Sequence, residues 1–116
     1  MKVVLDTNFL ISVLKFKIDF LSELQGEELY IVDKTKNELE KLIKGEKGKD
    51  KERAKIILQL IDKNKIKQIS SKKEDSVDAT LAKLKGYIIA TQDKELKKRI
   101  RGKKLIIRAK KKLEIR

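Results

Sequence analysis

Apolar positions follow two different spacings along the chain. Short, mostly apolar runs, typical of buried strands, occupy residues 2–5, 29–32, 87–90 and 105–107, and a brief further strand is predicted over residues 66–69. Between them, apolar residues recur three or four positions apart, which predicts helices. The first helical region is expected to run from Phe9 to Leu24, with a break. Further helices are expected around the apolar stripe of Leu39, Leu42 and Ile43, over residues 54–61, and over residues 94–100.

Glycines and one capping signal mark the expected ends of these elements. Gly26 ends the first helical region, and residues 45–50 form the clearest loop because two glycines stand there among charged residues. The segment Ser71–Glu74 has the spacing of a capping box, which predicts that a helix begins there and continues to Leu84. Gly86 is placed to end that helix.

Strands that alternate with helices indicate a parallel sheet covered by helices on both of its faces. We therefore predict a three-layer α/β domain. No internal repeat, low-complexity tract or linker interrupts the pattern. A chain of 116 residues with 40% apolar residues is expected to build one core, so residues 1–116 are interpreted as a single domain with one functional site.

The composition excludes several kinds of chemistry. The chain contains neither cysteine nor histidine, which rules out cysteine nucleophiles, serine–histidine–aspartate triads, and zinc sites built from those residues. Carboxylates without histidine or cysteine beside them favour magnesium or manganese. No apolar run approaches the roughly 18 residues of a membrane span, and no secretory signal is recognisable. A cytoplasmic protein with no membrane partner is therefore expected.

The formal net charge of +13 is concentrated near the C-terminus. Residues 94–116 hold 12 lysines and arginines against Glu95 and Glu114, whereas the rest of the chain is closer to balance. A concentrated basic surface indicates a polyanionic partner, because it neutralises phosphates and releases counterions. The alternative is a solvated, highly charged exterior of the kind that thermophilic proteins carry.

Acidic residues follow three of the predicted strands. Asp6, Asp33 and Asp93 occupy these positions, and ligands of open α/β sheets bind at the carboxyl ends of the strands. Each of the three has an ordinary explanation as a helix N-cap, which contributes about 1 kcal/mol. Glu38 has a similar explanation, because it stands three residues after Thr35 in the spacing of a capping box.

Asp78 is less easily explained as a cap, because it lies more than one turn inside its predicted helix, beside the apolar stripe. If the strands before Asp6 and Asp93 are neighbours, those two carboxylates emerge side by side, and each raises the pKa of the other unless a cation lies between them. A divalent cation is the natural partner. Side chains suited to orienting a carboxylate or a bound water stand next to them, at Thr7, Asn8 and Thr91.

Four segments resemble the motifs of PIN-domain nucleases and occur in the expected order, so that the similarity spans nearly the whole chain. They are residues 3–11, 37–39, 76–79 and 88–93, and their acids are Asp6, Glu38, Asp78 and Asp93. The run from Thr91 to Arg101 is similar to the branch of the family associated with ribosomal RNA processing. Short single-domain members of the family are also the toxins of VapBC-type toxin–antitoxin pairs.

The resemblance implies a five-stranded parallel sheet and a magnesium- or manganese-binding acidic pocket that cleaves RNA endonucleolytically. It assigns the pocket to Asp6, Glu38, Asp78 and Asp93, with Asp6 and Asp93 as the firmest metal ligands. It also implies RNA, and either a protein antitoxin or a ribosomal precursor particle, as partners, together with pairing as a homodimer. Glu40 remains an alternative to Glu38. Glu95 is either a fifth acid near the metal or, as we favour, an ordinary first-turn helix residue.

The expected activity is a metal-dependent ribonuclease, a VapC-type toxin or an rRNA-processing enzyme, in which metal-activated water attacks a phosphodiester. Phosphate contacts are expected to dominate RNA binding, because most of the few aromatic residues occupy core-like positions. The alternative is a non-catalytic RNA-binding or ribosome-assembly factor whose acids are helix caps. A phosphatase or a signalling receiver domain fits poorly, since Asn8 and Ser70-Ser71 stand where those folds need aspartates.

Overall fold

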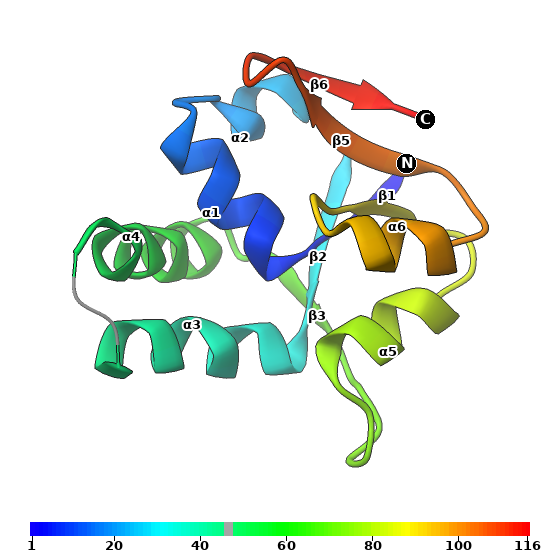
Figure 1. Ribbon diagram of the computed structural model, residues 1–116, viewed down its shortest axis with the longest axis horizontal. Helices are drawn as coiled ribbons and strands as arrows, with labels where there is room; N and C mark the ends of the chain where they lie inside the picture. Colours follow the sequence, from blue (N-terminus) through cyan, green and yellow to red (C-terminus); the bar gives the residue numbers. More distant parts are fainter. Residues whose placement is uncertain (46–47) are drawn as a thin grey trace.

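Strands and helices alternate along the chain in the computed structural model, which describes residues 1–45 and 48–116. The strands are β1 (Lys2–Leu5), β2 (Glu28–Val32), β3 (Lys67–Ile69), β4 (Ile88–Ala90), β5 (Lys104–Arg108) and β6 (Lys112–Ile115). The helices are α1 (Thr7–Lys15), α2 (Phe20–Glu23), α3 (Asp33–Gly45), α4 (Lys49–Lys63), α5 (Val77–Lys83) and α6 (Lys94–Arg99). The predicted strands are all present, and Figure 1 shows how the helices are arranged around them.

The strands of the described residues form one sheet in the order β3-β2-β1-β4-β5-β6. The first five of these strands pair in parallel, which confirms the α/β class and the predicted parallel sheet. β6 pairs antiparallel with β5 and extends the sheet beyond the five strands implied by the resemblance. The turn between β5 and β6 places Ala109 and Lys110 at positive φ, where glycine or asparagine is usual. Since neither residue type stands there, the sequence carries no hairpin signal at this turn.

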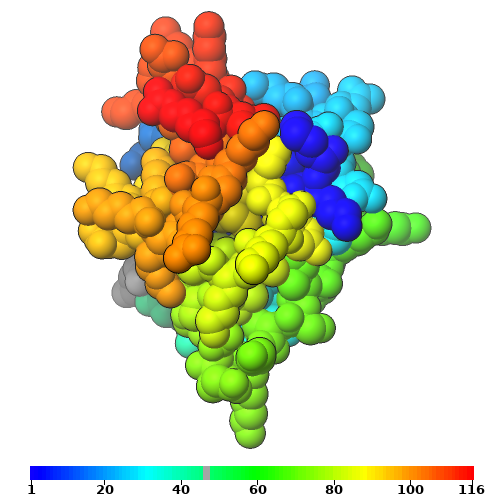
Figure 2. Space-filling view, turned by 90° about the vertical axis from the view of Figure 1, so that its right-hand side faces the viewer, coloured from blue at the N-terminus to red at the C-terminus, as the bar shows by residue number. Residues whose placement is uncertain are grey.

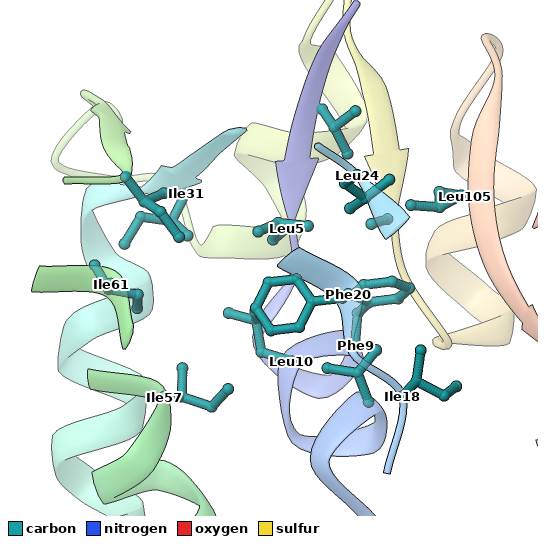
Figure 3. Packing of buried hydrophobic residues seen from close by; sticks show 14 of the residues in the cluster. Leu5, Phe9, Leu10, Ile18, Phe20, Leu24, Ile31, Ile57, Ile61 and Leu105 are labelled. Atoms are coloured by element: carbon teal, nitrogen blue, oxygen red, sulfur yellow. The ribbon is translucent and has the colours of Figure 1, made fainter. Parts of the chain in front are cut away.

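Alternate residues of the central strands face opposite helical layers. Val3 and Leu5 of β1 belong to the larger buried cluster, which includes residues of α1, α2, α3 and α4. Val4, which lies between them, belongs to a second cluster with residues of α5 and α6. Figure 3 shows the larger cluster, in which Leu5 of β1 is grouped with residues of the helical layer such as Leu10 and Phe20. This alternation produces the predicted three layers, because side chains leave a strand on alternate faces.

The capping-box prediction for α5 is wrong. Ser76 rather than Ser71 is the N-cap, and its hydroxyl accepts a hydrogen bond from Ala79 N at 3.1 Å. The Ser71 hydroxyl instead donates to Asp33 Oδ1 at 2.6 Å. Asp78 therefore lies in the first turn of α5, where an acid interacts favourably with the helix dipole, and not deep inside the helix as expected.

The helices α3 and α4 extend into both ends of the loop predicted at residues 45–50. Gly45 is the last residue of α3 and Lys49 is the first of α4, while residues 46 and 47 of that loop lie outside the described residues. Within the described ranges, none of the helices combines the length and the apolar character needed to span a membrane.

Candidate active site

Asp6 is buried at the carboxyl edge of the sheet, where β1 ends. Only 3% of its surface is exposed. Its backbone N–H donates to Ala90 O of the neighbouring strand β4 at 2.9 Å. Its Oδ1 accepts a hydrogen bond from Thr7 N, and its Oδ2 accepts one from Thr91 Oγ1, each at 2.8 Å. Both carboxylate oxygens are therefore oriented by groups at the ends of β1 and β4.

Among the described residues, the carboxylate of Asp6 takes part in none of the ion pairs within 4.0 Å. Burial raises the pKa of Asp6 to about 6, against the lowering effect of the Thr91 hydrogen bond, and the charges of Asp78 and Glu38 also raise it. A buried carboxylate in such surroundings favours either a proton or a cation.

Three of the four predicted acids line one open pocket of about 400 Å³. They reach it from three elements, since Asp6 follows β1, Glu38 belongs to α3 and Asp78 to α5. Thr7, the first residue of α1, ties the segment after β1 to α3, because its hydroxyl donates to Glu38 Oε1 at 2.5 Å. The other lining residues are Asn8, Lys41 and Leu42. The sequence interpretation missed the last two, although they lie three and four residues after Glu38 on the same helix face.

Asp93 lies outside this pocket and caps α6. Its Oδ1 accepts hydrogen bonds from Glu95 N at 2.9 Å and from Leu96 N at 3.1 Å. Its side chain lines a neighbouring cavity of about 360 Å³. Asn8 lines both cavities and so stands at their shared boundary.

The separation of Asp6 from Asp93 arises in the two residues that follow β4. The strands β1 and β4 are neighbours, as the sequence argument supposed. Thr91, however, follows β4 directly and takes the place beside Asp6. Its hydroxyl oxygen also accepts a hydrogen bond from Asp93 N at 3.1 Å. Asp93 is thereby directed into the start of α6, and the two carboxylates line separate cavities.

The remaining candidate acids have other surroundings. Asp33 begins α3, and its carboxylate accepts hydrogen bonds from the Ser71 hydroxyl and from the backbone N–H groups of Ser71 and Lys34, which together lower its pKa. Glu40 is exposed and does not line the pocket of Asp6. Glu95 is exposed in the first turn of α6 and pairs with Lys98 at 3.7 Å.

The pocket of Asp6 contains oxygen ligands of the kind that bind a divalent cation, although the carboxylates are not close enough together to form a complete metal site. In residues 1–45 and 48–116, no group of three or more carboxylates is close enough to hold a metal ion. Carboxylate and hydroxyl oxygens are the ligands that magnesium and manganese prefer. The donor set fits such an ion in kind, with the buried Asp6 as the fixed member and Glu38 and Asp78 on the surrounding helices.

The basic C-terminal region does not surround the acidic pocket, whose lining includes one lysine, Lys41, among the described residues. A cavity of about 670 Å³ lies instead at the amino ends of β4 and β5, and its cationic residues are Lys83, Lys85, Arg99 and Arg101. Figure 2 shows residues from both segments, in yellow and orange, on one face of the molecule. A polyanionic partner for this basic region remains a prediction.

Two buried threonines, Thr91 and Thr35, provide a test of how Asp6 is held. Thr91→Val is expected to lower the free energy of unfolding by about 1–3 kcal/mol, because it removes the hydroxyl that donates to Asp6 Oδ2. Thr35→Val is the matched control, since the buried Thr35 Oγ1 has no hydrogen-bond partner among the described residues. It is expected to be neutral or stabilising. Urea denaturation of both variants checks this, and equal losses would contradict a special role for Thr91.

Comparison with known proteins adds three findings. The family described as "PIN like domain" matches residues 3–111. The chain is 36% identical to "Ribonuclease VapC4" of Methanocaldococcus jannaschii, covering 98% of this chain and 95% of that protein. It is 33% identical to "Ribonuclease VapC9" of Archaeoglobus fulgidus, covering 83% of this chain and 73% of that protein.

Proposed function

Because the chain belongs to the PIN-like domain family, we propose that it is an endoribonuclease whose acidic pocket works with Mg²⁺ or Mn²⁺. The observation that carries this proposal is the buried Asp6, which shares one pocket with Glu38 and Asp78 and lacks a cationic partner among the described residues. The names of both relatives, which are ribonucleases, support the choice of RNA as the substrate.

In this proposal Asp6, Glu38 and Asp78 hold the cation. When bound, the metal lowers the pKa of a bound water and offsets negative charge on the phosphate that is attacked. The protein holds Asp6 rigid through Thr7 and Thr91, so that one carboxylate needs no rearrangement to bind the ion.

Asp93 has a different place in the proposal. One carboxylate oxygen of Asp93 accepts the hydrogen bonds that cap α6. Asp93 therefore contributes to the proposed active site through its other oxygen, from the neighbouring cavity. Asn8 lies at the boundary of the two cavities, where its side-chain amide can donate a hydrogen bond to a phosphate oxygen. The cleaved strand would then cross this boundary.

The biological role proposed is that of a VapC-type toxin with a protein antitoxin as its partner. The relatives carry VapC names, which favours this role over the processing of ribosomal RNA in a precursor particle. Pairing as a homodimer stays a prediction from the family resemblance.

Two glutamates on α3 provide the test of the catalytic pocket. Glu38→Gln is expected to lower kcat for RNA cleavage by about 10²-fold or more, because it removes a charged ligand of the proposed metal. Glu40→Gln is expected to leave kcat unchanged, since Glu40 is exposed on the same helix and does not line the pocket. The measurement is cleavage of end-labelled RNA with Mg²⁺ or Mn²⁺. If both variants cleave like the unmodified protein, or if none cleaves, a non-catalytic RNA-binding factor becomes the better proposal.

A further inference from the structure

The first turn of α3 carries a lysine whose ammonium group is surrounded by backbone carbonyls. Lys34 Nζ donates to Lys72 O at 2.7 Å, to Lys73 O at 3.0 Å and also to Asp75 O. An ammonium group has three N–H donors, so these carbonyls account for all of them. Lys34 is therefore not a free surface cation, although it stands only one helical turn before Glu38.

The same carbonyl-bearing segment is held at its beginning by the residue before Lys34. The Asp33 carboxylate accepts hydrogen bonds from Ser71 Oγ at 2.6 Å and from Ser71 N at 3.2 Å. Asp33 and Lys34, consecutive in sequence, thus hold both ends of residues 71–75. Hydrogen bonds to ionised groups are about twice as strong as neutral ones. The bonds of Asp33 and Lys34 therefore hold residues 71–75 firmly, although this segment otherwise protrudes from the domain (Figure 1).

The held segment leads directly into the turn that carries Asp78. Ser76 caps α5, and Asp78 is the second residue of that helix. The Asp75 side chain binds Lys83 of α5 at 3.0 Å, which ties the segment to the helix that follows it. In Figure 1 the start of α3 lies beside the start of α5, in agreement with the hydrogen bonds of Lys34. The contact therefore connects the two helices that supply Glu38 and Asp78 to the pocket.

We propose that Lys34 is a positioning residue for the acidic pocket: its ammonium group fixes residues 72–75 against the start of α3 and so sets the position of Asp78 relative to Glu38. This inference rests on the proposed function, because the separation of the two carboxylates matters only if they share a cation. Replacing a lysine that contacts RNA would change the affinity for RNA. Replacing Lys34, whose N–H groups are all bound to carbonyls, is expected to change metal affinity and kcat instead.

The absence of cysteine from the chain permits a single-site chemical test. Lys34→Cys removes the ammonium group, and alkylation with 2-bromoethylamine restores it as an S-aminoethyl side chain. Alkylation with iodoacetamide gives a neutral side chain of similar length. Lys36→Cys, treated in the same ways, is the matched control, because Lys36 lies on the same helix and pairs with Asp62 at 3.1 Å.

Mn²⁺ affinity, measured from the electron paramagnetic resonance signal of the free ion, is the first readout. Lys34→Cys and its neutral product are expected to bind Mn²⁺ about 10-fold or more weakly, as on loss of a group that orients metal ligands. Aminoethylation is expected to restore the affinity to within about twofold of the original value. Lys34→Arg keeps the charge but not the point geometry of an ammonium group, so this variant is expected to retain only part of the Mn²⁺ affinity. It also replaces Lys34→Cys in this test if the cysteine variant does not fold.

RNA affinity and its salt dependence separate positioning from direct contact. Both are expected to be unchanged in Lys34→Cys. A weaker RNA affinity with a flatter salt dependence, at unchanged Mn²⁺ affinity, would make Lys34 an RNA contact and overturn the inference. An equal loss of Mn²⁺ affinity in the Lys36 series would overturn it as well.

Amide hydrogen exchange of the metal-free proteins distinguishes failure of this inference from failure of the proposed function. Faster exchange at residues 71–80 is expected in Lys34→Cys, with recovery after aminoethylation. If the unmodified protein neither binds Mn²⁺ nor cleaves RNA, the proposed function fails, while this exchange pattern still supports the positioning of α5 by Lys34. Unchanged exchange at residues 71–80 would overturn the positioning role whatever the function of the pocket.

Discussion

Replacing Asp6 by asparagine is expected to lower RNA cleavage by about 10³-fold or more and, at neutral pH, to make the folded protein more stable. The loss of cleavage follows from the position of Asp6, which is the most buried of the pocket acids and is held by Thr7 and Thr91. Asparagine keeps the size of the side chain but lacks the charge that a divalent cation requires.

The gain in stability follows from the pKa of Asp6, which burial raises from 3.8 to about 6. Because the folded state binds this proton more tightly than the unfolded chain, the ionised form destabilises the fold as the pH rises from about 4 to about 6, and the full cost of about 3 kcal/mol is present above that range. Asparagine carries no such cost. Urea unfolding at pH 4 and at pH 7.5 is expected to show the gain only at the higher pH.

Asp62→Asn is the control for this variant, because Asp62 is an exposed acid outside the pocket. It is expected to leave RNA cleavage unchanged. Normal cleavage by the Asp6→Asn protein would refute the catalytic proposal. A loss of stability at both pH values would instead show that the hydrogen bonds of the carboxylate outweigh its charge.

Mn²⁺ is expected to stabilise the protein at pH 7.5 and to lose most of this effect at pH 5. At 100 times its dissociation constant, a ligand of the folded state adds about 3 kcal/mol to the free energy of unfolding, which raises Tm by about 10 °C in a domain of this size. Protons compete with the metal for Asp6, whose pKa is raised to about 6. Below that pH the carboxyl group of Asp6 is protonated and no longer binds the ion.

Thermal unfolding with and without Mn²⁺ at the two pH values measures this linkage. The Asp6→Asn protein is expected to show no pH-dependent Mn²⁺ effect, and Glu40→Gln to behave like the unmodified protein. A Tm shift of equal size at both pH values, or one that persists in Asp6→Asn, would place the bound ion elsewhere on the molecule.

Local patterns were sufficient for most of the fold. The strand runs and helical spacings located β1 to β5 and the helices between them, because burial on two faces or on one stripe leaves its period in the sequence. They failed at β6, whose turn uses Ala109 and Lys110 at positive φ. They failed again at α5, where Ser71 matches the local capping pattern but its hydroxyl is taken by Asp33, a residue 38 positions away.

The sequence by itself determined the available chemistry of this protein. Without cysteine or histidine, its candidate site is limited to carboxylates, hydroxyls, amides, amines and guanidinium groups, and strand ends identified Asp6 and Asp93 as candidates. Only the tertiary structure decided which acids meet, since Glu38 and Asp78 share the pocket of Asp6 while Asp93 lies in the next cavity. The reason is physical. A periodic pattern reports which face of an element is buried, but the distance between side chains on different elements depends on how those elements pack and on contacts such as that of Lys34.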